Sequence, residues 1–253
     1  MWRLYDELIE AVPQTSTVSD IMVGRNWVVV RSDGIGLAMA PPESGGSRQY
    51  SGSPRGQKTR DVAQWVKSWN FTEAAIGLAA INSAVNHPQA VERRFGSVPA
   101  QSPSEDLFDF IRPQVAGRKV TVVGHFPDLE RLSATCCLSI LERRPRDGDY
   151  PDPACEYILR QQDVVIMTAT TLINKTMPRL LELSQHAQIA VCGPSTPMVS
   201  ALFEHGVTLM GGCVVEDETR LWQAVQEGLA RDILSQGCRM LNLSAHDLSR
   251  QVP

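Results

Sequence analysis

The sequence lacks the features that mark nucleic-acid-binding and membrane proteins. No block of lysine and arginine interrupts its 253 residues, and its formal charge is -4. Since nucleic-acid binders neutralise phosphates with clustered basic side chains, this composition argues against such a partner. No apolar run approaches the roughly 18 residues that a membrane span needs. The first twelve residues carry Asp6, Glu7 and Glu10, which are untypical of a signal peptide, so we expect a cytoplasmic location.

The usual signatures of zinc binding and serine catalysis are also missing. The six cysteines all lie between residues 136 and 238 and form no CxxC pair. Reduced thiols that fill apolar space are therefore favoured over metal ligands. The segment GPSTP, residues 193–197, differs from the GxSxG elbow of serine hydrolases, and no histidine or acid adjoins Ser195. A nucleophilic serine is therefore not expected.

The first hundred residues predict a small α+β domain. Apolar side chains recur at helical spacing at its start, and three short β-branched runs follow, separated by turn-forming residues. Short links of this kind predict an antiparallel meander. The expected elements are a helix at 1–12, strands at 18–22, 26–31 and 35–40, and helices at 61–69 and 72–85. A Pro-, Gly- and Ser-rich loop at 41–58 either covers a ligand or extends into solvent.

The helix at 72–85 contains small residues that permit close packing and two amides on one face. Gly77 and its neighbouring alanines allow another backbone to approach. Asn82 and Asn86 are four residues apart, so both lie on the same side of the helix. Two interpretations remain open. The amides either satisfy backbone groups between domains, or Asn82 contacts a ligand.

Strands and helices alternate regularly after about residue 118. Units of this length predict a parallel sheet with helices on both faces, and right-handed crossovers make it doubly wound. The expected strands are 119–123, 136–142, 163–167, 188–192 and 207–210, and the expected helices are 127–135, 153–160, 177–184, 197–204 and 218–229. We therefore predict an α/β chain with an N-terminal α+β domain at 1–100 and a doubly wound domain at 101–253, joined through residues 87–118.

Small and polar residues follow three of the predicted parallel strands. The carboxyl ends of such strands meet at one edge of the sheet, where open α/β folds bind ligands. We expect the helix amide Asn82 to close this site from the first domain. The residues of the strand-end loops available to a ligand are Gly124, His125, Thr170, Thr171, Asn174, Gly193 and Ser195. The sequence thus predicts a small-molecule site.

The first of these loops argues against an ordinary dinucleotide site. The GxGxxG fingerprint is absent after the strand at 119–123. Pro127 fits the first position of a helix, which places Asp128 and Glu130 in its opening turn. Carboxylates at the positive end of a helix dipole repel a pyrophosphate. The loop therefore suits a cation, or a ligand recognised through hydroxyl groups.

His125 and Glu142 are the leading candidates for chemistry. His125, at the end of a strand, can ligate a transition metal or act as a general base, or it can simply hydrogen-bond the next loop. Glu142 lies 18 residues beyond Gly124, where Rossmann folds place the acid that binds ribose hydroxyls. The same carboxylate could ligate a metal or remain solvated. Asp147, Asp149 and Asp152 are interpreted as turn formers.

Four segments resemble a known family. They are GLAAIN at 77–82, VVGHFP at 122–127, EYILRQQDVVIMTATTLINKT at 156–176 and VCGPSTPM at 191–198. They are similar to the family described as "putative heavy-metal chelation", formerly a domain of unknown function, and the resemblance covers essentially the whole chain. It implies an enolase-N-terminal-like domain followed by a Rossmann-like domain, with the ligand site between them.

Three functions follow as hypotheses. The preferred one is a protein that binds a transition-metal ion or a metal-bearing small molecule between its domains, with His125 and Glu142 as metal ligands. The alternative is a transferase or lyase for a nucleoside-containing or hydroxylated molecule, with His125 as base, Glu142 on the hydroxyls and the Thr/Asn loop on an anionic group. A non-catalytic interaction module is the third. The sequence leaves a homodimer open.

Overall fold

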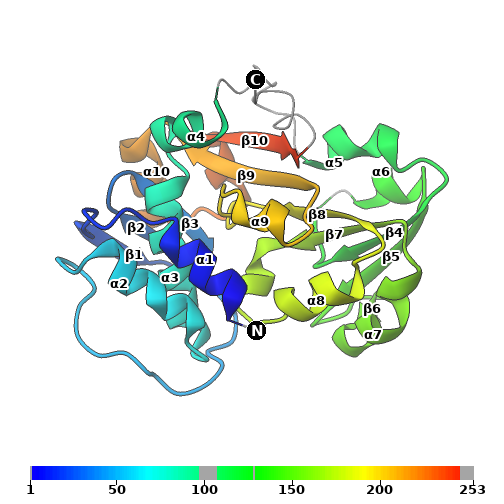
Figure 1. The fold of residues 1–253 in the computed structure, drawn as a ribbon, viewed down its shortest axis with the longest axis horizontal. Helices are drawn as coiled ribbons and strands as arrows, with labels where there is room; N and C mark the ends of the chain where they lie inside the picture. Colours follow the sequence, from blue (N-terminus) through cyan, green and yellow to red (C-terminus); the bar gives the residue numbers. More distant parts are fainter. Residues whose placement is uncertain (1, 97–106, 128, 246–253) are drawn as a thin grey trace.

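The computed structural model describes residues 2–96, 107–127 and 129–245, and it contains two sheets that lie side by side (Figure 1). The smaller sheet is antiparallel and has the order β1-β2-β3. Its strands are β1 (Asp20–Val23), β2 (Trp27–Arg31) and β3 (Ile35–Met39), and its helices are α1 (Arg3–Glu10), α2 (Thr59–Ala63), η1 (Gln64–Lys67), α3 (Phe71–Val85) and α4 (Pro88–Phe95). The predicted meander with helices is confirmed. Helix α4 begins at Pro88 in a stretch predicted only to join the two halves, because proline suits a helical first turn.

The larger sheet has the order β10-β9-β8-β7-β4-β5-β6, and every neighbouring pair is parallel except β9 and β10. The chain therefore winds outward in both directions from β4, as predicted for a doubly wound fold. The strands are β4 (Lys119–Val123), β5 (Cys137–Glu142), β6 (Tyr150–Pro151), β7 (Val164–Thr168), β8 (Gln188–Cys192), β9 (Leu209–Val215) and β10 (Cys238–Ser244).

Short helices accompany these strands, and the five α-helices that correspond to predicted ones (α6 to α10) are each shorter than the sequence pattern suggested. They are α5 (Leu107–Ile111), η2 (Arg112–Gln114), α6 (Leu129–Ser133), η3 (Asp152–Ala154), α7 (Cys155–Ile158), η4 (Leu159–Gln161), η5 (Ala169–Leu172), α8 (Met177–Leu183), α9 (Ala201–Glu204), α10 (Glu218–Gln226) and η6 (Arg231–Ser235). Within the ranges that the structure describes, none of the helices has the length and apolarity to cross a membrane.

The end of the larger sheet differs from the prediction. Strand β9 continues to Val215, so Gly211 and Gly212 lie inside it rather than at its end. A Cβ atom on Gly211 would lie 2.7 Å from Cδ1 of Leu107, so this glycine makes room for packing. The antiparallel edge strand β10 was not predicted, because its pairing with β9 depends on how the chain returns in space rather than on local pattern.

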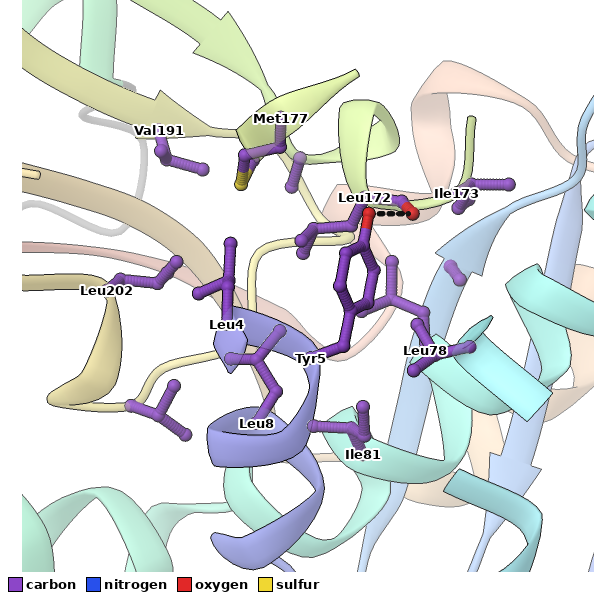
Figure 2. Close-up of a cluster of buried hydrophobic side chains, with 14 of the residues drawn as sticks. Leu4, Tyr5, Leu8, Leu78, Ile81, Leu172, Ile173, Met177, Val191 and Leu202 are labelled. Carbon is purple, nitrogen blue, oxygen red and sulfur yellow. Dashed lines mark hydrogen bonds between the residues drawn. The ribbon is translucent and has the colours of Figure 1, made fainter. Parts of the chain in front are cut away.

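The two sheets share one hydrophobic core, because α1 packs between them. Figure 2 shows Leu4, Tyr5 and Leu8 of α1 facing α3 on one side and the loop after β7 on the other. The Tyr5 hydroxyl donates a hydrogen bond of 3.0 Å to the carbonyl oxygen of Leu172. A shared core holds the two halves in a fixed relation. The predicted boundary at residues 100 and 101 lies outside the described residues.

Helix α3 approaches its neighbours as closely as its small residues allow. A Cβ atom on Gly36 of β3 would overlap the backbone of Ala79 and Ser83. A Cβ atom on Gly77 would overlap the backbone nitrogen of Val66 in η1. The close packing predicted from Gly77 and the adjacent alanines is therefore confirmed.

Candidate functional site

A cavity of about 600 Å³ lies between the two sheets. Its floor is formed by the carboxyl ends of β4 and β7, between which the strand order reverses, and by the end of β8. The end of β3 and the beginning of loop 41–58 close it from the other side. Six of the predicted site residues line this cavity: Gly124, His125, Glu142, Thr170, Asn174 and Gly193.

The other three predicted site residues do not line the cavity. The amide of Asn82 donates hydrogen bonds to the carbonyl oxygens of Leu37 at 2.7 Å and Ser195 at 3.0 Å. Ser195 Oγ accepts a hydrogen bond from the backbone nitrogen of Met39 at 2.9 Å. Thr171 Oγ1 donates to the carbonyl oxygen of Thr168 at 2.6 Å. Because these side chains are buried and bonded to protein, they connect backbone segments around the cavity instead of facing a ligand.

Asn86 supports the same interpretation of the helix amides. Its Nδ2 donates to the carbonyl oxygen of Thr196, and its Oδ1 accepts from the backbone nitrogen of Met198, both at 2.8 Å. Asn82 and Asn86 together hold the loop after β8 against α3. Of the two interpretations that the sequence left open, the structure therefore favours the one in which the amides satisfy backbone groups.

The His125 ring is held by a carboxylate. Its Nδ1 lies 2.9 Å from Oδ2 of Asp149, whose side chain is only 2% exposed. The backbone nitrogen of Arg146 donates to the same oxygen at 2.9 Å. A carboxylate oxygen accepts from N–H, so Nδ1 is the donor of this hydrogen bond, and in the neutral ring the lone pair is then on Nε2. Nε2 has no hydrogen-bonding partner in the part of the chain that the structure describes, and the ring lines the cavity.

Asp149 is the site residue that the sequence interpretation missed. It does form a turn, as predicted, but its buried carboxylate also orients His125. The two residues follow different strands, β4 and β5, which are neighbours in the sheet. No sequence motif links them. One signal could have suggested the His125–Asp149 pair. A histidine and an acid follow two strands that the strand order makes parallel neighbours.

The Glu142 carboxylate is already engaged by two loops. Its Oε2 accepts from the backbone nitrogen of His125 at 2.8 Å, and its Oε1 accepts from that of Arg144 at 3.1 Å. Glu142 thus contributes negative charge to the cavity and also holds the loops after β4 and β5 through their backbone nitrogens. Across the described ranges, no group of three or more His, Cys, Asp or Glu side chains is arranged to hold a metal ion. His125 and Glu142 alone do not complete the coordination of a bare ion.

The Thr/Asn loop presents neutral polar groups. Thr168 Oγ1 and Thr170 Oγ1 are 3.0 Å apart, and Asn174 Oδ1 accepts from the Thr176 hydroxyl at 2.7 Å. The Asn174 side chain lines the cavity, whereas Lys175, the only charge in this loop, does not. The Lys175 ammonium is instead buried and donates to the carbonyl oxygen of Ile173 at 2.6 Å. An anionic ligand therefore does not meet Lys175.

Apolar side chains form much of the remaining wall. They come from strands, helices and loops of both halves of the structure and include Trp27, Phe71, Phe108, Phe126 and Met240. A cavity with aromatic walls and a few converging polar groups is typical of sites for organic molecules. Of the two carboxylates predicted at the start of the first crossover helix, Glu130 lies in the first turn of α6 and Asp128 lies outside the described residues.

Two family models match the chain, and both carry the description "putative heavy-metal chelation". One matches residues 5–85 and the other, DUF364, matches residues 106–244. A DUF364-family protein of unknown function from Desulfitobacterium hafniense is 40% identical, and the match covers 96% of this chain and 98% of that chain with a TM-score of 0.88. One from Pyrococcus horikoshii is 18% identical over the same shares, with a TM-score of 0.79, and shows the fold alone. No curated protein matches the chain.

Proposed function

The chain belongs to the DUF364 family described as "putative heavy-metal chelation", and from this premise we propose that it binds a metal-bearing small molecule in the cavity between its two sheets. The observation that carries the proposal is the hydrogen bond between His125 Nδ1 and Asp149. A carboxylate on one ring nitrogen is the usual support of a metal-binding histidine, because it fixes the tautomer and raises the basicity of the other nitrogen. In this arrangement Nε2 of His125 is the ligand to the metal.

The composition of the cavity favours a metal complex over a bare ion. The protein offers one open imidazole nitrogen and a Glu142 carboxylate that already accepts two backbone hydrogen bonds. Among the described residues, no three His, Cys, Asp or Glu side chains are arranged to complete a coordination shell. A volume of about 600 Å³ with aromatic walls, in contrast, accommodates an organic chelator that supplies the other donors. Thr170 and Asn174 can then hydrogen-bond the chelator, whereas the N–H of Gly193 is already bonded to the carbonyl oxygen of Gly211.

Binding of a copper(II)–nitrilotriacetate complex tests the proposal. This complex keeps a coordination position open, so an imidazole that binds it adds nitrogen hyperfine structure to the copper electron paramagnetic resonance spectrum. We expect the intact protein to bind one equivalent and to show this structure. His125→Ala removes the metal ligand, so we expect the affinity of the protein for the copper complex to fall by about a hundredfold or more. Loss of a residue that only supports a metal ligand typically costs about 10- to 100-fold, and loss of the ligand itself should cost at least as much.

His186→Ala is the matched control, because His186 is an exposed histidine with no part in the cavity. It should bind the complex as the unmodified protein does. Equal affinity of the His125→Ala and His186→Ala proteins would show that copper binds surface histidines only, and the proposal would be wrong. Free copper(II) should bind less tightly than the complex does at the His125 site.

Asp149→Asn tests how His125 is oriented. The amide of asparagine can donate to Nδ1, which moves the ring proton to Nε2 and blocks the metal ligand. We expect the affinity for the copper complex to fall about 10- to 100-fold. Asp147→Asn, which changes an exposed carboxylate in the same turn, should leave the affinity unchanged. An unchanged affinity in Asp149→Asn, measured by titration calorimetry, would contradict the assigned role of Asp149.

A second candidate is an enzyme that acts on a nucleoside-containing or hydroxylated small molecule. The His125–Asp149 pair favours it, because an imidazole oriented by a carboxylate is also a general base. In this case Nε2 would take a proton from a substrate hydroxyl, and the threonines after β7 would position the substrate. A thermal stabilisation of the metal-free protein by nucleosides that His125→Ala abolishes would favour this candidate over the metal complex.

A further inference from the structure

Three charged side chains line the cavity where it opens to solvent. Arg143 and Arg144 follow β5, and Glu43 belongs to loop 41–58 of the smaller sheet's domain. Each of the three is roughly half exposed. The two guanidinium groups are the only cations along the cavity wall in the described ranges. They therefore determine which charge a ligand meets at this end.

The carboxylate of Glu43 bridges the two arginines. Its Oε2 lies 3.5 Å from Nη2 of Arg143, and its Oε1 lies 3.1 Å from Nη2 of Arg144. Each oxygen thus faces a different guanidinium, which is the geometry that a ligand carboxylate would adopt. Arg143 also pairs with Asp152 at 3.3 Å, whereas every ion pair of Arg144 within the described ranges is with Glu43.

Loop 41–58 holds Glu43 in this place. The last residue of β3, Met39, donates its backbone N–H to Oγ of Ser195, and Gly45 pairs with Asn70 just beyond Glu43. Further along, the buried carboxylate of Glu73 accepts hydrogen bonds from the backbone nitrogens of Gln49 and Tyr50. Because the backbone is held on both sides of residue 43, the Glu43 side chain can swing away without unfolding the loop.

We propose that Arg143 and Arg144 form a carboxylate-binding subsite of the cavity and that Glu43 occupies it until a ligand carboxylate displaces it. This inference rests on the proposed function and adds the chemistry of the ligand, an organic chelator that bears carboxylate groups. Exposed ion pairs contribute only about 0–1 kcal/mol, so an incoming carboxylate can replace Glu43 at little cost.

The position of Glu142 suggests how the ligand is oriented, with its metal at His125 and its carboxylates at the arginine pair. Its carboxylate accepts hydrogen bonds from the backbone nitrogens of both His125 and Arg144, so it joins the loop that carries the imidazole to the loop that carries the arginine pair. A metal held at His125 would meet this negative charge, and the chelator's carboxylates would meet the guanidinium groups. The cavity is thus complementary to a complex that is cationic at its metal and anionic at its edge.

Citrate without metal is the probe for the subsite, and its neutral trimethyl ester is the matched ligand. In titration calorimetry at low salt, citrate should bind and the ester should not. Arg144→Gln removes a charge-assisted hydrogen bond and should weaken citrate binding about tenfold. Glu43→Gln removes the internal competitor and should strengthen it about threefold. Glu216→Gln, which breaks an exposed ion pair with Arg239 outside the cavity lining, should change nothing.

The inference is wrong if Arg144→Gln and Glu43→Gln bind citrate like the Glu216→Gln control, or if inorganic phosphate binds more tightly than citrate. The replaced side chains are exposed, so equal melting temperatures are expected and a folding defect can be recognised. The copper spectrum separates the two proposals. If Arg144→Gln still shows imidazole coordination of copper and also binds citrate as the unmodified protein does, only the carboxylate subsite is rejected. If Arg144→Gln weakens citrate binding but the copper spectrum does not depend on His125, only the proposed function is rejected.

Discussion

Replacing Gly77 with alanine is expected to destabilise the protein by about 3 kcal/mol or more. The added methyl group would overlap the backbone nitrogen of Val66, and a backbone atom cannot move aside as the end of a flexible side chain can. Helix α3 would have to shift away from η1. Since Asn82 and Asn86 of α3 hold the loop after β8, the shift would reach the cavity. Urea unfolding followed by circular dichroism measures the loss of stability.

Gly46→Ala is the control for this substitution. The backbone of Gly46 has no positive φ, and the nearest atom to an added Cβ is Cβ of Trp69 at 3.3 Å. The change should alter the free energy of unfolding by less than about 1 kcal/mol. If Gly77→Ala unfolds at the same urea concentration as Gly46→Ala, then α3 and η1 are not packed as closely as the structure indicates.

Replacing Lys175 with methionine is expected to raise stability at neutral pH and to change its dependence on pH. Burial lowers the pKa of the Lys175 ammonium from 10.5 to about 7. The residue also has a φ of 68°, a strained value for a side chain other than glycine. Its Nζ donates to the Ile173 carbonyl and lies 5.9 Å from the centre of the Tyr5 ring. Among the residues that the structure describes, Lys175 contacts no carboxylate that would stabilise the charge.

The sign of the effect follows from proton binding. Between pH 7 and 10.5 the unfolded chain carries a proton on Lys175 that the folded chain lacks, so the free energy of unfolding rises with pH. The slope due to this group approaches about 1.4 kcal/mol per pH unit within that window. Below pH 7 Lys175 is protonated in both states, and burial of the charged ammonium then lowers the free energy of unfolding relative to its value at high pH. Lys175→Met removes this contribution to the slope.

Urea unfolding of both proteins from pH 6 to 10 measures the difference. The cysteines are common to both chains, so the difference between the two curves isolates Lys175. Lys119→Met, at an exposed strand position, should keep the slope of the unmodified protein. Parallel curves for Lys175→Met and the unmodified protein would contradict the lowered pKa. We expect instead that the methionine variant is the more stable at pH 7 and that its advantage decreases towards pH 10.

The fold was predictable because its signals are local. Alternating runs of β-branched and helix-forming residues set each strand and helix, and short Gly-containing links set the antiparallel meander. Strand β10 escaped prediction because an edge strand is defined by its partner β9. The helix at 197–204 shrank to Ala201–Glu204 because the preceding residues bond to Asn86 instead of continuing a helix.

The candidate site was predictable to the extent that it lies at strand ends. Gly124, His125, Glu142, Thr170, Asn174 and Gly193 share one cavity because parallel strands bring their carboxyl ends to one edge. Asn82, Thr171 and Ser195 have the same kinds of side chain, but the structure places them outside the cavity. Their polar groups satisfy buried backbone atoms, and a sequence does not reveal which atoms will be buried beside them.

The sequence by itself determined the two-part α/β organisation and the loops that could hold a ligand, because the periodicity and chemistry of side chains act over a few neighbouring residues. Only the tertiary structure decided that Asp149 supports His125, that Glu43 reaches the arginines after β5, and that Lys175 is buried away from the cavity. The physical reason is that strand order and domain packing bring together side chains from distant loops, and these contacts depend on the whole core rather than on any one segment.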